Sequence, residues 1–402
     1  MPAFPVSRIR AQFPSLREGS AFFDGPGGTQ TPECVAAAIR DALVAAVSQR
    51  GRNSHFARGA DRIVNAARAA MGDFLHVSPE AVVFGRSATQ LTFDFSAAIG
   101  ELLDSGDEIA LSRLDHDANV APWLAVAEAK GLQVRWIDFD RTTGEISLDD
   151  AARAITPRTR LVAIAAASNL LGTTPDIAAI AGMAHEVGAL VYVDAVAYAA
   201  HELIDLDRMG ADFVVCSSYK FCGPHLGILG SRPETLQRLH TRKLRPSTEQ
   251  VPERFELGTL PYELLAGVTA TVEFLAGLVP ADRSRRERLE ASYRAMQHHE
   301  DALRDRLLTG LDAIPGVTRI GVPPAATPTV LFAIDGVPVD EACRVLGDRE
   351  IIVGGGTFYA YEAARWADLG DGGIRAGISL YTTVDDIDRL LSGVRDLASR
   401  RP

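Results

Sequence analysis

A lysine directly follows an apolar stretch in the segment VVCSSYKFCGPHLGILG, residues 214 to 230. The strand-like run ends at Cys216, and Lys220 stands just before a Gly-Pro turn and a second apolar run. A lysine at a strand end often snorkels, so that its ammonium group reaches water. A desolvated lysine amine instead loses its proton readily and attacks a carbonyl group to form an imine. Both interpretations of Lys220 fit this segment alone.

Other polar side chains stand where predicted strands end. An aspartate that follows an apolar run, as Asp194 does, needs a positive partner if it is buried; otherwise it caps a helix. His116 offers a flat ring, although a surface loop is its simplest alternative position. In mostly parallel sheets, ligands bind beyond the carboxyl ends of the strands. The strand-end residues are His116, Ser168, Asn169, Asp194, Ser217, Ser218, Tyr219 and Lys220.

The combination of Asp194 and Lys220 predicts a pyridoxal-phosphate site. That cofactor needs a carboxylate to keep its pyridine nitrogen protonated and a lysine to hold it as an imine. The segment GRSATQLTF, residues 85 to 93, is a small-residue loop that enters a helix, and such a helix start attracts phosphate. His116 would stack on the ring and relay protons. The nucleotide-binding patterns GxxxxGK[ST] and GxGxxG are absent from the sequence.

The elements that position these residues alternate between strands and helices. Helical spacing covers 34–50, 59–76, 91–103, 119–131 and 176–188, and strands are predicted near 81–85, 107–112, 132–140, 160–168, 189–196 and 211–218. Alternation of this kind predicts an α/β fold with a mostly parallel sheet and right-handed crossovers.

A different pattern begins near residue 280. A long polar-faced helix is predicted over 283–314, then strands over 316–322, 327–334 and 373–380, with helices over 338–349 and 383–400. The sequence therefore predicts a large cofactor-binding domain over 20–280 and a small α+β domain over 281–402. Residues 1–19 are expected to pack on the small domain. Two glycine-rich loops, 24–32 and 353–359, have no role assigned by the pattern.

Composition excludes several classes of protein. The net charge of −11 over 402 residues disfavours nucleic acid and anionic membranes as partners. No segment has the length of a signal peptide or membrane span, so a cytoplasmic protein is expected. The four cysteines, Cys34, Cys216, Cys222 and Cys343, lack metal-ligand spacing, and no metal site is expected.

Nearly the whole chain, from FFDGPGGTQTP to RAGISLYTTVDDIDRLL, resembles the class V aminotransferase family of fold type I pyridoxal-phosphate enzymes. The cysteine desulfurase and selenocysteine lyase branch is the most similar. The resemblance implies a homodimer that acts on an amino acid, with Lys220, His116 and Asp194 as catalytic residues. It implies that Thr259 reaches the phosphate of the neighbouring subunit. The implied cofactor contacts are Ala88, Thr89, His116, Asn169, Asp194, Ser217, Tyr219, Lys220 and Thr259, and the implied substrate contacts are Arg375, Asn169 and His55.

Three positions depart from the family pattern. Ala197 replaces a glutamine that contacts the cofactor ring oxygen, and Tyr219 replaces the histidine before the lysine. The desulfurases of the family carry a mobile cysteine upstream of the substrate-binding arginine, whereas residues 351–373 contain none. We therefore expect C–S lyase or related elimination chemistry without a persulfide. An aminotransferase, an epimerase and a non-catalytic pyridoxal-phosphate protein remain the alternatives.

Overall fold

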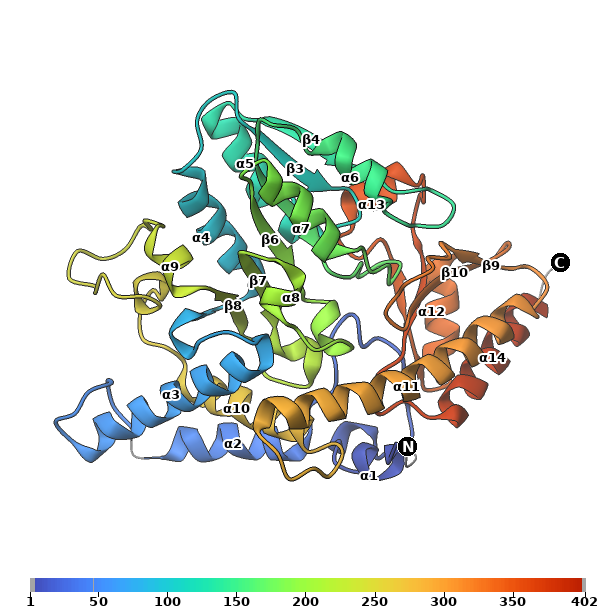
Figure 1. Ribbon diagram of the computed structural model, residues 1–402. Helices are drawn as coiled ribbons and strands as arrows, with labels where there is room; N and C mark the ends of the chain where they lie inside the picture. Colours follow the sequence, from blue (N-terminus) through green and yellow to red (C-terminus); the bar gives the residue numbers. More distant parts are fainter. Residues whose placement is uncertain (1–3, 46, 400–402) are drawn as a thin grey trace.

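A computed structural model describes residues 4–45 and 47–399, and Figure 1 shows how its elements are arranged. The central sheet has seven strands, and its order is β2-β8-β7-β6-β5-β3-β4. From β7 to β4 all neighbours are parallel, and only β8 runs antiparallel to both of its neighbours. The prediction of a mostly parallel sheet is thus confirmed. The strands are β2 (Val82–Gly85), β3 (Glu108–Ser112), β4 (Gln133–Ile137), β5 (Thr159–Ala165), β6 (Leu190–Asp194), β7 (Phe213–Ser217) and β8 (Gly227–Ser231).

Helices cover both faces of this sheet, which is why its central strands are apolar without alternation. In β7, Val214 and Cys216 belong to one core cluster, and Phe213 and Val215 belong to the other. Helices α3 (His55–Leu75), α6 (Leu148–Ala154), α7 (Ile177–Glu186) and α10 (Tyr262–Ala276) pack in the first cluster. Helices α4 (Ala88–Gly100), α5 (Ala121–Lys130) and α9 (Pro233–Gln237) pack in the second.

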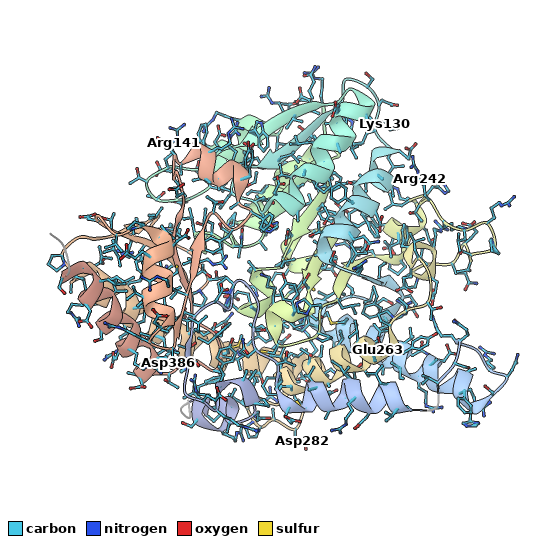
Figure 2. The ribbon with its side chains drawn as sticks, turned by 180° about the vertical axis from the view of Figure 1, so that it is seen from behind. Lys130, Arg141, Arg242, Glu263, Asp282 and Asp386 are labelled. Atoms are coloured by element: carbon cyan, nitrogen blue, oxygen red, sulfur yellow. The ribbon has the colours of Figure 1, made fainter. Side chains whose placement is uncertain are left out.

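A smaller antiparallel sheet follows in the C-terminal part, with the order β12-β13-β10-β9. Its strands are β9 (Val317–Ile320), β10 (Thr329–Ile334), β12 (Gly354–Gly356) and β13 (Gly373–Gly377). Helices α11 (Arg285–Asp312), α12 (Val339–Gly347) and α14 (Val384–Ser399) share a third core cluster with them. Figure 2 shows the reverse side of the molecule, with Asp386 of α14 marking this part.

The N-terminal segment contacts the C-terminal part. Arg10 at the end of α1 (Val6–Arg10) forms an ion pair with Asp386 at 3.0 Å. The two-residue strand β1 (Ala21–Phe22) pairs in parallel with β11 (Ile351–Ile352). Arg8 of α1 also donates to the backbone oxygen of Leu278 at 2.8 Å, outside that part. The domain limits, with residues 1–19 assigned to the small domain, stay a prediction, and residues 1–3 lie outside the described residues.

Most helix boundaries differ from the predicted ones by up to three residues, and two differ by more. Helix α2 (Glu33–Val44) ends before residue 50, and Arg50 instead pairs with Asp61 of α3 at 2.8 Å. Helix α3 begins at His55, earlier than predicted, because Ser54 caps it by accepting a hydrogen bond from the backbone N–H of Ala57. Among the described helices, none is both long and apolar enough to cross a membrane.

Candidate active site

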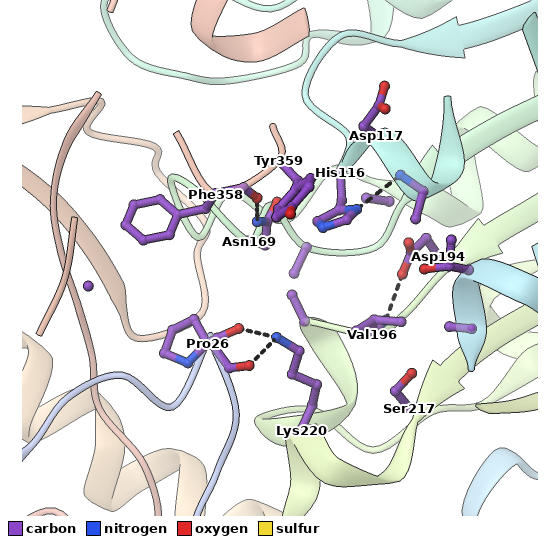
Figure 3. A pocket seen from close by; sticks show the side chains of 18 of the residues that line it. Pro26, His116, Asp117, Asn169, Asp194, Val196, Ser217, Lys220, Phe358 and Tyr359 are labelled. Atoms are coloured by element: carbon purple, nitrogen blue, oxygen red, sulfur yellow. Dashed lines mark hydrogen bonds between the residues drawn. The ribbon is translucent and has the colours of Figure 1, made fainter. Parts of the chain in front are cut away.

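A cavity of about 850 Å³ lies at the carboxyl ends of β5, β6 and β7, where the parallel sheet was predicted to bind a ligand. The N-terminal turn of α4 and two loops, around residues 24–27 and 354–361, complete its walls (Figure 3). Most of the residues predicted for the site line this one cavity: Ala88, Thr89, His116, Asn169, Asp194, Ser217, Tyr219, Lys220 and Arg375. The residues that the sequence assigned to one site are therefore neighbours in the folded chain as well.

Lys220 projects into the cavity from a short 3-10 turn, Ser218–Phe221, directly after β7. The next residue, Cys222, has the left-handed φ of 72° that closes this turn, and Phe221 anchors it by stacking on Phe74. The amine donates hydrogen bonds to the backbone oxygens of Pro26 and of Gly27, the latter at 3.0 Å. Burial, helped by the positive charge of Arg375, lowers the pKa of Lys220 to about 8. The side chain is thus a desolvated amine and does not snorkel.

Asp194 ends β6 and is 7% exposed. One carboxylate oxygen accepts a hydrogen bond from the backbone N–H of Val196 at 2.8 Å, and within the described chain the residue forms no ion pair. Burial raises the pKa of Asp194 to about 6, with a smaller opposing effect from Lys220. Asp194 does not cap the following 3-10 turn, Tyr198–Ala200, whose N-cap residue is Ala197. The buried carboxylate is therefore without an ion-pair partner among the described residues.

The loop before α4 forms a third wall. Ser87 is the N-cap residue of α4, and its hydroxyl accepts from the backbone N–H of Gln90 at 3.1 Å. The loop lies directly on β8, because a Cβ atom at Gly227 would come within 2.3 Å of the Ser87 backbone. Ala88 and Thr89, in the first turn, border the cavity. A first helical turn has unpaired N–H groups and the positive end of the helix dipole, both of which favour an anion such as phosphate.

His116 stacks on Tyr359 in the wall of the cavity, with ring centroids 5.6 Å apart (Figure 3). Its Nδ1 accepts a hydrogen bond from the backbone N–H of Ala118 at 3.0 Å, so the neutral ring carries its proton on Nε2. Burial and the charges of Lys220 and Arg375 lower the pKa of His116 to about 4. A neutral imidazole with a fixed tautomer can stack on a flat ligand and donate from Nε2.

Arg375 of β13 is buried and also lines the cavity. Its Nη1 donates to the backbone oxygen of Asn169 at 2.9 Å, and its Nη2 pairs with Asp24 at 3.0 Å. The ring of Phe358 lies 3.7 Å from the guanidinium carbon. Asn169 in turn donates from Nδ2 to the backbone oxygen of Phe358 at 2.8 Å, and its buried Oδ1 has no partner within the described residues. The buried Nε of Arg375 also has no partner among the described residues, so an amide oxygen and one guanidinium N–H are available for a polar ligand.

Sequence reasoning missed Asp24, Phe358 and Tyr359, all of which lie in or beside the glycine-rich loops. Their only signal was the two clusters of glycine. It also missed Asp115, a buried carboxylate that accepts from Asn119 Nδ2 at 2.7 Å and from the backbone N–H of Ala165 at 3.0 Å. Burial raises the pKa of Asp115 to about 8. Asp115 therefore positions the loop that carries His116 against β5.

Two predicted site residues lie outside the cavity of this single chain. Thr259 accepts a hydrogen bond from Gln49 at 2.9 Å and borders a separate cavity behind the loop before α4. His55 is the first residue of α3 and packs against Phe56. Their roles in a cofactor or substrate site stay predictions.

The four cysteines also lie outside the walls of this cavity. Cys216 and Cys222 are buried, Cys34 is exposed, and Cys343 is half-buried in α12. Burial raises the pKa of Cys222 to about 12 and that of Cys343 to about 11. Within the described residues no group of histidine, cysteine and carboxylate side chains has the arrangement of a metal site.

Comparison with known proteins extends these observations. The family model described as aminotransferase class-V matches residues 21–390. An uncharacterised protein of Mycobacterium tuberculosis is 34% identical, with 99% of each chain covered. A probable cysteine desulfurase of Pseudomonas aeruginosa is 32% identical over 94% of this chain and 95% of its own. The solved cysteine desulfurase of Thermococcus onnurineus has the same fold, with a TM-score of 0.90 over 99% of each chain at 23% identity.

Proposed function

The chain belongs to the aminotransferase class-V family, and from this premise we propose that it is a pyridoxal-phosphate-dependent enzyme acting on an amino acid by elimination. The observation that supports this best is the pairing of a desolvated amine, Lys220, with a buried carboxylate, Asp194, that lacks a cationic partner among the described residues. Both line a single cavity of about 850 Å³.

The residues present fit the proposed cofactor. Lys220 would hold its aldehyde carbon covalently, Asp194 would accept from its pyridine nitrogen, and the first turn of α4 would bind its phosphate. When bound, pyridoxal phosphate supplies a conjugated ring that withdraws electrons from the substrate's Cα. Ser217 and Tyr219 also line the cavity, and the Tyr219 ring is held by stacking on His225 at 4.6 Å. Their hydroxyls are proposed phosphate contacts.

Each remaining polar group has a proposed task. Arg375 would bind the substrate α-carboxylate, as a guanidinium fork does best. Lys220, once released, would move a proton at Cα, because a neutral amine is a suitable base near pH 8. His116 would stack on the ring and donate from Nε2. Asn169 Oδ1 would accept a hydrogen bond from the substrate or the cofactor.

Elimination without a persulfide is favoured over desulfuration through a protein thiol. A persulfide mechanism needs a thiolate that reaches the substrate sulfur. Residues 351–373 contain no cysteine, and no cysteine borders the cavity. The segment that faces the cavity is instead held by the residues that follow β3 and β4: Trp366 donates to the backbone oxygen of Phe139 at 2.8 Å, and Arg113 pairs with Glu362 at 2.5 Å.

A transaminase or an epimerase would use the same groups, and a non-catalytic cofactor protein would need only some of them. Buried Arg375 argues against the last alternative, because keeping a guanidinium group away from water serves no purpose in cofactor binding alone. Elimination, transamination and epimerisation differ in their products and not in the residues described above.

The test begins with the purified protein. It should be yellow, and borohydride should remove the visible absorbance while fixing the cofactor to the peptide that contains Lys220. Incubation with each amino acid in turn, with assays for ammonia, keto acid and released thiol, would then identify the reaction. A colourless protein that takes up no pyridoxal phosphate would refute the proposal; racemised substrate without keto acid would replace elimination by epimerisation.

A further inference from the structure

Asp24 forms an ion pair with Arg375, the residue that is proposed to bind the substrate carboxylate. Its Oδ1 lies 3.0 Å from Nη2 of Arg375, while Nη1 of the arginine already donates to Asn169. Nε is buried and has no hydrogen-bond partner within the described part of the chain. A ligand carboxylate therefore meets an arginine that carries a counter-ion, with one nitrogen unused.

The carboxylate of Asp24 fits into a space that two glycines leave open. A Cβ atom at Gly27 would lie 2.5 Å from Oδ2 of Asp24, and a Cβ atom at Gly354 would lie 3.1 Å from Oδ1. The backbone N–H groups of Gly27 and Gly28 also donate to the backbone oxygen of Asp24, at 3.0 and 3.1 Å. Gly27 and Gly354 come from the two glycine-rich loops. These loops together make room for an acid beside Arg375.

Arg375 itself cannot move away easily. Phe358 covers one face of its guanidinium group at 3.7 Å, and the Phe358 backbone is tied to Asn169. The arginine side chain is 3% exposed, whereas that of Asp24 is 35% exposed. When a ligand carboxylate competes for Nη2, Asp24 is the partner with room to leave.

We propose that Asp24 is a specificity-determining residue that favours zwitterionic ligands over simple carboxylates. This rests on the proposed function, because it takes Arg375 as the carboxylate-binding residue. A simple carboxylate displaces Asp24 and brings a second anion to the arginine, which is unfavourable. A zwitterion brings its own ammonium group, which pairs with the displaced Asp24. Asp24 thus makes the pocket reject organic acids that share only the carboxylate of an amino acid.

Two ligands of nearly the same shape test this directly. N,N-dimethylglycine is a zwitterion whose tertiary amine cannot form an imine, and 3-methylbutanoate is its carbon analogue without the positive charge. Their dissociation constants are measured by calorimetry on the protein as purified. The wild type should bind dimethylglycine more tightly. In Asp24→Asn, 3-methylbutanoate should bind about tenfold more tightly than in the wild type, and the preference for dimethylglycine should shrink by a similar factor.

Asp117→Asn is the matched control, because Asp117 is another carboxylate of the same cavity and forms no ion pair within the described residues. It should change the ratio of the two constants by less than about twofold. Arg375→Gln should weaken the binding of both ligands. Asp24→Ser provides a second variant if circular dichroism shows that Asp24→Asn is misfolded. The inference would be overturned if the folded Asp24 variants kept the wild-type ratio of the two dissociation constants. It would also be overturned if Arg375→Gln left the binding of both ligands unchanged. Failure to take up pyridoxal phosphate would refute the proposed function alone, since neither ligand reacts with it.

Discussion

The reactive lysine owes its proposed chemistry to its surroundings, because the same side chain in water is a poor nucleophile at neutral pH. Lys220 is held by two backbone oxygens, and Asp24 and Asp194 only partly offset the effect of burial on its charge. The decisive point is that the pKa of Lys220 is lowered. A cation that is destabilised by burial releases its proton at lower pH, and the neutral amine that remains can attack an aldehyde.

A pH dependence of cofactor uptake follows from this shift. With a pKa near 8, about half of the Lys220 amines are neutral at pH 8, against about one in 300 for an ordinary lysine. The rate at which cofactor-free protein becomes yellow with added pyridoxal phosphate should rise with pH and level off above about 8. Stopped-flow absorbance measures this rate. Lys220→Arg should form no covalent bond with the cofactor and should stay colourless. Lys130→Arg, on the exterior of α5, should behave as the wild type. A rate that still rises steeply above pH 9 would contradict the prediction.

At the scale of elements, the loop before α4 depends on the absence of a side chain in β8. A Cβ atom at Gly227 would lie 2.3 to 2.6 Å from backbone atoms of Ser87 and Ala88, which cannot rotate away. The loop must therefore shift, and its shift moves the N–H groups proposed to bind phosphate. Gly230, in the same strand, offers a comparison, because its Cβ atom would meet the Leu75 and Val214 side chains instead.

Gly227→Ala should therefore weaken pyridoxal-phosphate binding about tenfold or more, at a cost of about 1–3 kcal/mol in the free energy of unfolding. Gly230→Ala should lower stability by a similar amount and leave the affinity nearly unchanged. Equilibrium dialysis and urea unfolding measure the two quantities separately. Equal losses of affinity in the two variants would mean that general destabilisation, and not the loop, weakens the cofactor.

The sequence was sufficient to predict the elements whose conformation depends on a short stretch of residues. Apolar strands ending at Asp194 and Ser217, and the loop that enters α4, followed from composition and period. Those strand ends are brought together by a parallel sheet, so the core of the site was predictable as well. Asp24 and Phe358 were not, because they meet Arg375 only after two loops more than 300 residues apart in sequence pack together. No local pattern reports such a contact.

At the scale of the whole molecule, Thr259 is a proposed site residue that a single chain leaves outside the cavity. It borders a separate cavity behind the loop before α4. Several large apolar side chains are exposed in the two segments that the Gln49–Thr259 hydrogen bond joins, residues 43–56 and 244–259. Exposed apolar side chains that form one patch are typical of an interface. They are Leu43, Val44, Phe56, Leu244 and Leu257.

We accordingly expect a homodimer in which this face is covered. Sedimentation equilibrium should give twice the chain mass of 43.1 kDa. Thr259→Ala should weaken cofactor binding several-fold while the dimer persists, and Thr248→Ala, in the same region of the chain, should not. Leu257→Glu should shift the protein toward monomers. A monomer that retains its cofactor at micromolar concentration would show that Thr259 has no such role.

The distribution of thiols over the whole molecule leads to the last prediction. Cys222 is close to Lys220 in sequence, but it is fully buried, its pKa is raised to about 12, and its backbone closes the turn that holds the lysine. Cys34 is exposed yet lies in α2, and Cys343 lies in α12. A thiol must be both ionised and mobile to take sulfur from a substrate. Replacing Cys34 and Cys343 by serine and the buried Cys216 and Cys222 by alanine should therefore leave turnover within about twofold of the wild type, apart from any loss of stability. Sulfur from a cysteine-like substrate should leave as sulfide or a small thiol, and intact-protein mass spectrometry after turnover should show no added sulfur atom. A persulfide found on Cys222, together with lost activity in Cys222→Ser but not in Cys34→Ser, would restore the mechanism through a protein thiol.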